Sequence, residues 1–136
     1  MNSFKLISND NTSFIEVCKI HYNIEDGYHP SVGFDLKIKT TIIDYIGSEF
    51  WYNKSDIDSA IIILNQLENR ENTALNFKAY SEFSLMIKMQ DSAGHYYVEF
   101  SVDDPINRAS LKSNYIIDHA VLSNFKTFLI DIQNGF

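Results

Sequence analysis

The chain contains one layout twice: a block of alternating strand patterns that leads directly into an amphipathic helix. The first predicted helix begins at Ser55 and ends near Glu68, and the second begins at His119 and ends near Gln133, because apolar residues recur there with i, i+3, i+4, i+7 spacing. Strands and helices grouped in this way are typical of α+β domains. We therefore expect an α+β fold with a mostly antiparallel sheet of about eight strands and both helices packed on one face.

Segments of alternating apolar and polar residues predict the strands. The clearest segment places Phe34, Leu36 and Ile38 on one side and charged residues on the other. The other predicted strands cover residues 4–6, 14–24, 42–52, 75–79, 83–89, 96–102 and 111–117. In segment 14–24 the even-numbered residues are mostly apolar, which predicts that Cys18 is buried. Gly47 predicts a bulge or bend in its strand.

Capping residues mark the helix ends. Ser55 followed three residues later by Asp58 forms a capping-box pattern, Asp118 is a suitable N-cap for the second helix, and Gly135 follows that helix. No linker rich in proline, glycine or serine divides the chain, so residues 1–136 are expected to form a single domain. The two blocks suggest a duplication, but their side chains cannot be aligned convincingly from the sequence.

The charge of the chain limits the kinds of partner. The 136 residues carry a net charge of −7, and the acidic excess is concentrated in the first half of the chain. Nucleic acid and anionic membranes repel an acidic protein, so neither is expected as a partner. A basic protein is a suitable partner, although the charge can also serve solubility alone.

The cysteine content and the hydropathy of the chain indicate its compartment. Cys18 is the only cysteine, which excludes an intramolecular disulfide. The first residues lack the charged and apolar segments of a signal peptide, and no apolar segment approaches the roughly 20 residues that span a membrane. We expect a soluble cytoplasmic protein, and its oligomeric state is open.

Residues that could carry out catalysis or bind a metal are present, but their spacing is unsuitable. His21, His29, His95 and His119 do not pair with one another, and Cys18 is expected on the strand face opposite to His21. The chain has no nucleophile elbow and no glycine-rich phosphate loop. We therefore expect no metal, no cofactor and no enzymatic activity.

Three groups of acidic and aromatic residues are candidates for binding a protein partner. They are Glu25, Asp26 and Tyr28; Glu49, Trp51 and Tyr52; and the pair Asp103 and Asp104. Tryptophan and tyrosine contribute a large share of the binding energy at interfaces. Each group also has a purely structural alternative: the only tryptophan can close the end of the core, Tyr28 can anchor its loop, and adjacent acids can simply be solvated.

The second half of the chain has a pattern that can be compared with known families. It consists of residues 75–87, a hairpin containing Gly94, residues 115–118, and a closing helix with Leu122, Phe125 and Leu129. This pattern resembles the WapI family of bacterial immunity proteins. The resemblance covers residues 75–132, and the first half matches in its layout of strands and helix.

The resemblance implies a protein that binds and neutralises a cognate secreted toxin domain, often a nuclease, made by the same cell. Such an inhibitor needs a stable scaffold and a complementary surface but no catalytic groups. Acidity suits this role, because the active sites of nucleases are basic. The residues leave two alternatives open: a small-molecule-binding or enzymatic α+β domain with a pocket lined by Phe and Tyr, and a structural or assembly role.

Overall fold

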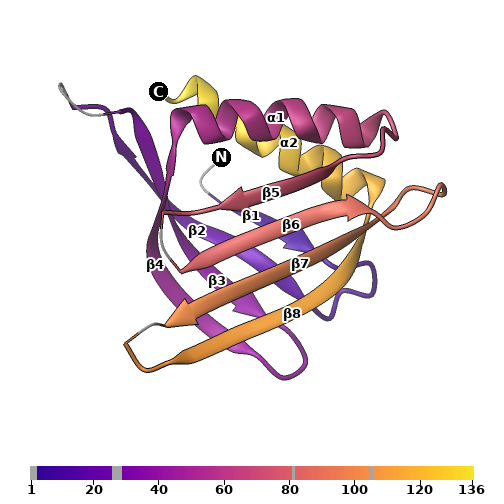
Figure 1. The fold of residues 1–136 in the computed structure, drawn as a ribbon, viewed down its shortest axis with the longest axis horizontal. Helices are drawn as coiled ribbons and strands as arrows, with labels where there is room; N and C mark the ends of the chain where they lie inside the picture. The colour runs from indigo at the N-terminus through magenta and orange to yellow at the C-terminus, as the bar shows by residue number, and fades with distance from the viewer. Residues whose placement is uncertain (1–2, 26–28, 81, 105) are drawn as a thin grey trace.

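The computed structural model describes residues 3–25, 29–80, 82–104 and 106–136, and within these ranges the chain forms eight strands and two helices (Figure 1). In chain order they are β1 (Phe4–Ile7), β2 (Phe14–Asn23), β3 (Ser31–Lys39), β4 (Asp44–Asn53), α1 (Lys54–Glu68), β5 (Ala74–Lys78), β6 (Phe83–Met89), β7 (His95–Asp104), β8 (Ala109–Asp118) and α2 (His119–Asn134). All of the predicted strands and helices are present, with ends that differ by a few residues.

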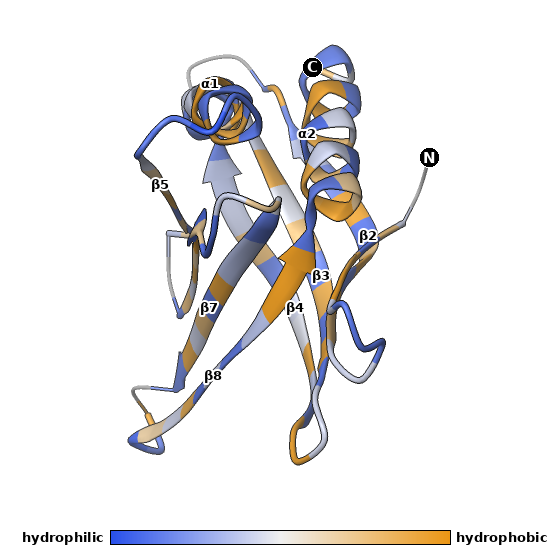
Figure 2. Ribbon diagram, turned by 90° about the vertical axis from the view of Figure 1, so that its right-hand side faces the viewer, coloured by the Kyte–Doolittle hydropathy of each residue, from blue (hydrophilic) through white to orange (hydrophobic). Residues whose placement is uncertain are grey.

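The strands form two four-stranded sheets, with the orders β1-β2-β3-β4 and β5-β6-β7-β8. All of the described pairings are antiparallel, which confirms the predicted α+β fold. The sheets face each other, and their strands cross (Figures 1 and 2). The division into two sheets was not predicted. It arises because α1 follows β4 directly, so that β5 begins a new sheet instead of pairing with β4.

The two helices lie side by side across one open end of the space between the sheets (Figure 2). α1 packs against β5, and α2 packs against β1. The helices therefore join the first strands of the two sheets, whereas the sequence suggested that they cover the face of one sheet. Within the described ranges, neither helix combines the length and apolar character needed to cross a membrane.

Aromatic side chains fill the space between the sheets. The ring of Phe128 in α2 stacks on Phe4 of β1 with a centroid distance of 4.9 Å and lies 5.9 Å from Phe34 of β3. Tyr52 of β4 stacks on Phe77 of β5 at 4.0 Å, which joins the two sheets directly. The buried side chains of both sheets and both helices belong to one continuous cluster. Burial of apolar surface is thus what holds the sheets together.

Each helix begins at a capping residue that ends a strand. Asp118 caps α2 as predicted, and its Oδ1 accepts a hydrogen bond from the first turn at 2.9 Å. For α1 the prediction was wrong by two residues: the N-cap is Asn53 rather than Ser55, and the carboxylate of Asp56 rather than Asp58 accepts from the N–H of the cap, at 2.9 Å. Asparagine is as good an N-cap as serine. The capping-box pair Asn53 and Asp56 also precedes the pair Ser55 and Asp58 in the chain.

A bulge changes the side-chain alternation in β2. The register between β2 and β3 shifts between Val17 and Lys19. Val17 is buried and Cys18 is exposed, so the prediction that Cys18 is buried was wrong. One extra residue reverses the inward and outward positions of a strand. As a result, Cys18 and His21 are both neighbours of Asp35 and do not lie on opposite faces.

The two strand–helix blocks are built alike. β4 and β8 each contain ten residues and lead directly into a helix. The N–H of Tyr80 donates to the carbonyl of Trp51 at 2.9 Å, and the N–H of Asn9 donates to the carbonyl of Ile116 at 2.9 Å. Trp51 and Ile116 each lie three residues before their helix, so equivalent hydrogen bonds join the two blocks at two corners between the sheets. The fold is therefore a pseudo-symmetric repeat in which the helix of each block packs on the first strand of the other.

Candidate partner-binding surface

The structure separates the eight candidate residues. Asp26 and Tyr28 lie outside the residues that the structure describes, and Glu25 is exposed just beyond the end of β2. The remaining candidates lie in β4 and at the end of β7: Glu49, Trp51, Tyr52, Asp103 and Asp104. They do not form one surface. Trp51 and Tyr52 are on opposite faces of β4, and Asp103 and Asp104 are at the end of β7.

Tyr52 does not contribute to a surface. Its side chain is 1% exposed and stacks on Phe77, so the prediction that it contacts a partner was wrong. Alternation along β4 explains the difference, since Phe50 and Tyr52 point between the sheets and Trp51 points outward. In the described residues the Tyr52 hydroxyl has no hydrogen-bond partner, and burial raises its pKa.

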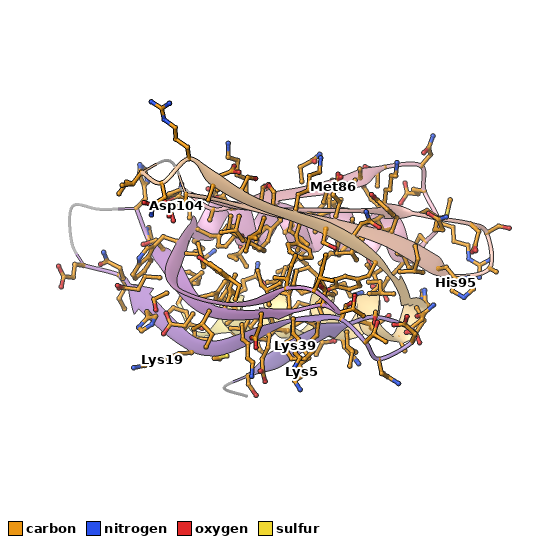
Figure 3. All side chains as sticks on the ribbon, turned by 90° about the horizontal axis from the view of Figure 1, so that it is seen from below. Lys5, Lys19, Lys39, Met86, His95 and Asp104 are labelled. Carbon is orange, nitrogen blue, oxygen red and sulfur yellow. The ribbon has the colours of Figure 1, made fainter. Side chains whose placement is uncertain are left out.

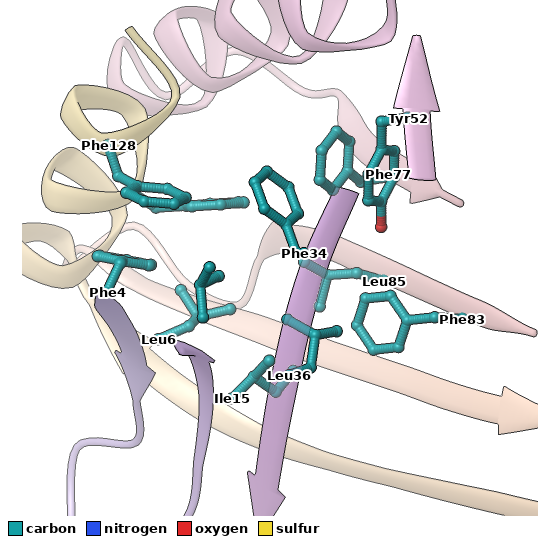
Figure 4. Close-up of a pocket in the computed structure, with 12 residues that line it drawn as sticks. Phe4, Leu6, Ile15, Phe34, Leu36, Tyr52, Phe77, Phe83, Leu85 and Phe128 are labelled. Carbon is teal, nitrogen blue, oxygen red and sulfur yellow. The ribbon is translucent and has the colours of Figure 1, made fainter. Parts of the chain in front are cut away.

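A small cavity lies between the sheets beside Tyr52 (Figure 4). It is lined by apolar and aromatic side chains from β1 to β6 and from α2, and its volume is about 30 Å³. A cavity of this size holds about one water molecule. The aromatic-lined pocket of the small-molecule hypothesis is therefore too small for an organic ligand in this structure.

Trp51 lies on the outer face of the first sheet, over Gly33 of β3. A Cβ on residue 33 would lie 2.8 Å from the indole Cε2, so glycine is what allows the ring to lie against the sheet. His21 of β2 is on the other side of Gly33, with its ring centroid 6.4 Å from that of Trp51. Because the indole is on the outer face, Trp51 does not close the end of the core.

Asp35 links His21 to β4. Its Oδ1 lies 3.1 Å from His21 Nε2 and accepts a hydrogen bond from the N–H of Glu49 at 2.9 Å. Glu49 has a φ of 58° and lies in the bulge predicted at Gly47, where the register with β3 shifts. Partial burial alone would raise the pKa of Asp35, but the hydrogen bonds from Glu49 and His21 outweigh it and lower the pKa. The Glu49 side chain itself is exposed.

Asp103 and Asp104 line a groove of about 290 Å³. They are the last residues of β7, which ends away from the helices (Figure 1), and Figure 3 labels Asp104. The lining of the groove also includes Glu82, Tyr45 of β4, Val102, Ala109, Ser110 and Leu111. Among these lining residues there is no lysine or arginine. We call this site the acidic groove.

Hydrogen bonds fix the two aspartates of the acidic groove. Ser110 Oγ donates to Asp103 Oδ1 at 2.8 Å, and Asn107 Nδ2 donates to Asp104 Oδ2 at 2.8 Å. Hydrogen bonds from Asn107, with a further one from the N–H of Ile106, lower the pKa of Asp104. Asp104 is therefore ionised at neutral pH, and the groove keeps its negative charge.

Tyr45 adds a phenol hydroxyl to the lining of the acidic groove. Burial, together with the negative charges of Glu82 and Asp104, raises the pKa of Tyr45, so the phenol stays protonated and neutral. Gly47 leaves room for this ring, because a Cβ there would lie 2.7 Å from the Tyr45 hydroxyl oxygen. The groove thus places the carboxylates of Glu82 and Asp104 near one neutral hydroxyl that can donate a hydrogen bond. Asp103 points to the outer face of β7, where its carboxylate accepts from Ser110.

Exposed isoleucines lie in the turns at this end of the molecule. Ile106 follows Asp104 in the β7–β8 turn and is 89% exposed, and Ile42 in the β3–β4 turn is 90% exposed. Protein interfaces combine apolar side chains with a polar and charged rim. The turns therefore add exposed apolar side chains at the end of the molecule where the acidic groove lies.

The sequence analysis missed Tyr45, Glu82 and Ile106. Glu82 and Asp103 are far apart in the chain but meet at the ends of β6 and β7, where the N–H of Asp103 donates to the carbonyl of Glu82 at 2.7 Å. Sequence spacing does not predict this meeting, because it depends on which strands pair. Ile106 did carry a signal: it is the one large apolar residue in an otherwise polar turn.

The histidines lie in separate places. His95 Nδ1 lies 2.9 Å from Asp91, in the turn before β7, and His119 lies next to Tyr96 at the start of α2. Within the described ranges, no group of three or more His, Cys, Asp or Glu side chains is arranged to hold a metal ion.

Comparison of the chain with protein-family models and with curated proteins found no match.

Proposed function

We propose that this protein is an immunity protein, which binds and neutralises a cognate toxin domain in the cytoplasm of the cell that makes both. The acidic groove carries this proposal. Glu82, Asp103 and Asp104 belong to its lining, which contains no lysine or arginine, and the almost fully exposed Ile106 lies in the adjacent turn. This is the chemistry of a surface that receives a basic protein.

Charge and apolar area have different roles in such a complex. Carboxylates attract lysine and arginine side chains and raise the rate of association with a basic partner. Burial of an exposed isoleucine against the partner contributes about 1.5–3 kcal/mol. A nuclease domain is a suitable toxin, because the surface that binds its substrate is basic. Nucleic acid itself is not proposed as a partner, since its phosphates would be repelled by the groove.

The outer face of the first sheet is a second proposed contact. Trp51 is half-buried there, and the side chains of Glu49 and Glu25 are exposed. β4 separates this face from the acidic groove, since Trp51 points outward while Tyr45 lines the groove. A partner that used both would have to extend around β4.

Capture of the partner followed by a growth assay tests the proposal. Tagged protein is used as bait in an extract of its own source cells, and the proteins retained are identified by mass spectrometry. The retained domain is then expressed in a host cell with or without this protein. We expect the domain to arrest growth when expressed alone and growth to be restored by the wild-type protein.

The matched variants give the assay its specificity. Glu82→Lys with Asp103→Lys reverses the charge of the acidic groove and should abolish the protection. Glu71→Lys, an exposed acid in the α1–β5 connection, makes the same kind of change elsewhere and should leave it intact. A folded groove variant that protects as well as the wild type would rule out the acidic groove as the binding surface.

A further inference from the structure

The two sheets have four edge strands, and two of them, β1 and β5, make the more extensive contacts with the helices. β1 and β5 pack against α2 and α1 respectively. β4 and β8 are the other two edges; each begins at the end of the molecule away from the helices and runs into a helix at its C-terminal end (Figure 1). An uncovered edge strand presents unpaired backbone N–H and C=O groups to which another strand can bind.

β8 is the more regular of these two edges. It pairs with β7 at ten successive positions without a register shift. β4, in contrast, is interrupted between Gly47 and Phe50, and Glu49 has a positive φ in that interruption. Bulges of this kind bend an edge and hinder further pairing. β8 is therefore the edge that is suited to accept a strand.

One hydrogen bond identifies the free backbone groups of β8. The carbonyl of Ile116 accepts from the N–H of Asn9, so the backbone groups of Ile116 point away from β7. In an antiparallel ladder both groups of a residue point to the same side, and the side alternates along the strand. The N–H and C=O groups of Ser110, Lys112 and Asn114 consequently point to the open edge. No backbone hydrogen bond in the described residues uses them.

Two grooves run along this edge. Residues 109–111 line the acidic groove, and residues 113–116 line a second groove of about 490 Å³. The opposite wall of the second groove contains Thr40, Thr41 and the exposed Ile42, and the β1–β2 turn closes it. Grooves thus border the free edge of β8 along residues 109–111 and 113–116.

The charges around β8 indicate which kind of strand would bind. Glu82, Asp103 and Asp104 lie at the end where β8 begins. The one lysine of β8, Lys112, is held on the outer face of the sheet by Glu99, with 3.3 Å between Nζ and Oε1. It does not belong to the lining of the acidic groove. A strand that carries lysine or arginine near one end and apolar residues along its length would match both the acidic groove and Ile42.

We infer that the free edge of β8 binds an extended, basic segment of the partner polypeptide by strand addition. The inference rests on the proposed function, since it describes how the partner is held. Backbone hydrogen bonds to Ser110, Lys112 and Asn114 supply affinity, and basic side chains of the segment pair with the carboxylates of the acidic groove. The segment becomes a fifth strand of the second sheet.

Amide hydrogen exchange followed by NMR tests the inference on the wild-type protein. The probe is a capped peptide, Lys-Lys-Val-Thr-Val-Thr-Val-Thr-Lys-Lys. In the free protein, the amides of Leu111 and Ser113 should exchange slowly and those of Ser110, Lys112 and Asn114 rapidly. At saturating peptide, we expect exchange of these three amides to slow at least tenfold. Unchanged exchange at all three with millimolar peptide would overturn the inference.

Two control peptides separate the contributions of backbone and charge. The same peptide with glutamate in place of each lysine should bind at least tenfold more weakly. The same peptide with proline in place of each threonine keeps the charge but cannot form a strand, and it should not protect the three amides. Equal protection by either control peptide would contradict strand addition of a basic segment.

A pair of variants at one residue applies the same test to the natural partner. Lys112→Pro removes a free N–H and obstructs the edge, whereas Lys112→Ala changes the side chain and keeps the N–H. We expect at least a tenfold loss of affinity for Lys112→Pro relative to Lys112→Ala. If the Glu82→Lys and Asp103→Lys changes weaken partner binding while these two variants bind equally, the proposed function stands and the strand-addition mode is wrong.

Discussion

Asn53 and Asp118 lie 65 positions apart and occupy the same place in the two halves of the fold: each ends a ten-residue strand and is the N-cap of the helix that follows. The same offset relates the buried residues of the two helices. Ile57, Ala60, Leu64 and Leu67 of α1 correspond to Leu122, Phe125, Leu129 and Ile132 of α2. Because only one of these four pairs has the same residue type, the repeat can be seen in the pattern of burial but not in the sequence.

Removal of the hydroxyl group should have opposite effects on the free energy of unfolding at two buried tyrosines, Tyr52 and Tyr115. In the described residues the Tyr52 hydroxyl has no partner, so Tyr52→Phe should leave the free energy of unfolding unchanged or raise it by up to about 1 kcal/mol. The Tyr115 hydroxyl donates to the carbonyl of Leu6 at 2.5 Å, so Tyr115→Phe should lower it by about 1–2 kcal/mol. Urea unfolding of both variants measures the difference. A loss of more than 1 kcal/mol in Tyr52→Phe would instead show that a water in the adjacent cavity binds the hydroxyl.

Gly33→Ala should displace the indole of Trp51. The added Cβ would lie 2.8 Å from the ring, in a site where the indole rests against the sheet. Trp51 is the only tryptophan, so its fluorescence reports this site alone. We expect emission to shift to longer wavelength as the ring moves into water, together with a loss of about 1–3 kcal/mol in stability. Asn76→Ala, at an exposed position of β5, is the control and should leave the emission unchanged. An unshifted spectrum in a folded Gly33→Ala protein would contradict the described packing.

Asp35→Asn should reduce stability at neutral pH but not in acid. Its hydrogen bonds with His21 and Glu49 lower the pKa of Asp35 in the folded protein below the ordinary value of about 3.9. A group whose pKa is lowered by folding stabilises the protein fully above its unfolded pKa, and this contribution is lost as the pH falls through the folded pKa. We expect a difference of about 1–2 kcal/mol between wild type and variant at pH 7, which shrinks below pH 4.

Urea unfolding of wild type and Asp35→Asn from pH 7 down to pH 2.5 measures this dependence. Asp44→Asn, at the exposed start of β4, is the matched control for removal of an aspartate charge and should unfold like the wild type at pH 7. A difference for Asp35→Asn that stays constant, or that grows as the pH falls, would show that Asp35 does not act through its charge.

Periodicity was sufficient to predict the elements but not their assembly. The alternation of Phe34, Leu36 and Ile38 and the apolar stripes of both helices are local signals, and the structure contains these elements where they were predicted. The division into two sheets depends on long-range pairing, for which the sequence contains no local signal. The bulge that exposes Cys18 reverses an alternation that was otherwise easy to interpret.

The candidate surface was predicted only in part, for the same reason. Asp103 and Asp104 were recognised because they are adjacent in the chain, whereas Glu82 joins them only through the pairing of β6 with β7. Tyr52 was grouped with Trp51 as an interfacial aromatic, although neighbouring residues of a strand point to opposite faces. Applying strict alternation to the segment from Phe50 to Tyr52 would have indicated that Tyr52 lies inside.

The affinity of the purified partner for matched surface variants tests directly whether the acidic groove is the binding surface. The partner captured from source cells is titrated by calorimetry against wild type, Glu82→Lys with Asp103→Lys, and Ile106→Asp. The controls are Glu71→Lys and Ile62→Asp, the second at an isoleucine of α1 that is 60% exposed. We expect the groove and Ile106 variants to bind at least tenfold more weakly and both controls to bind like the wild type. Equal affinities across all of these folded proteins would contradict the claim that the acidic groove holds the partner.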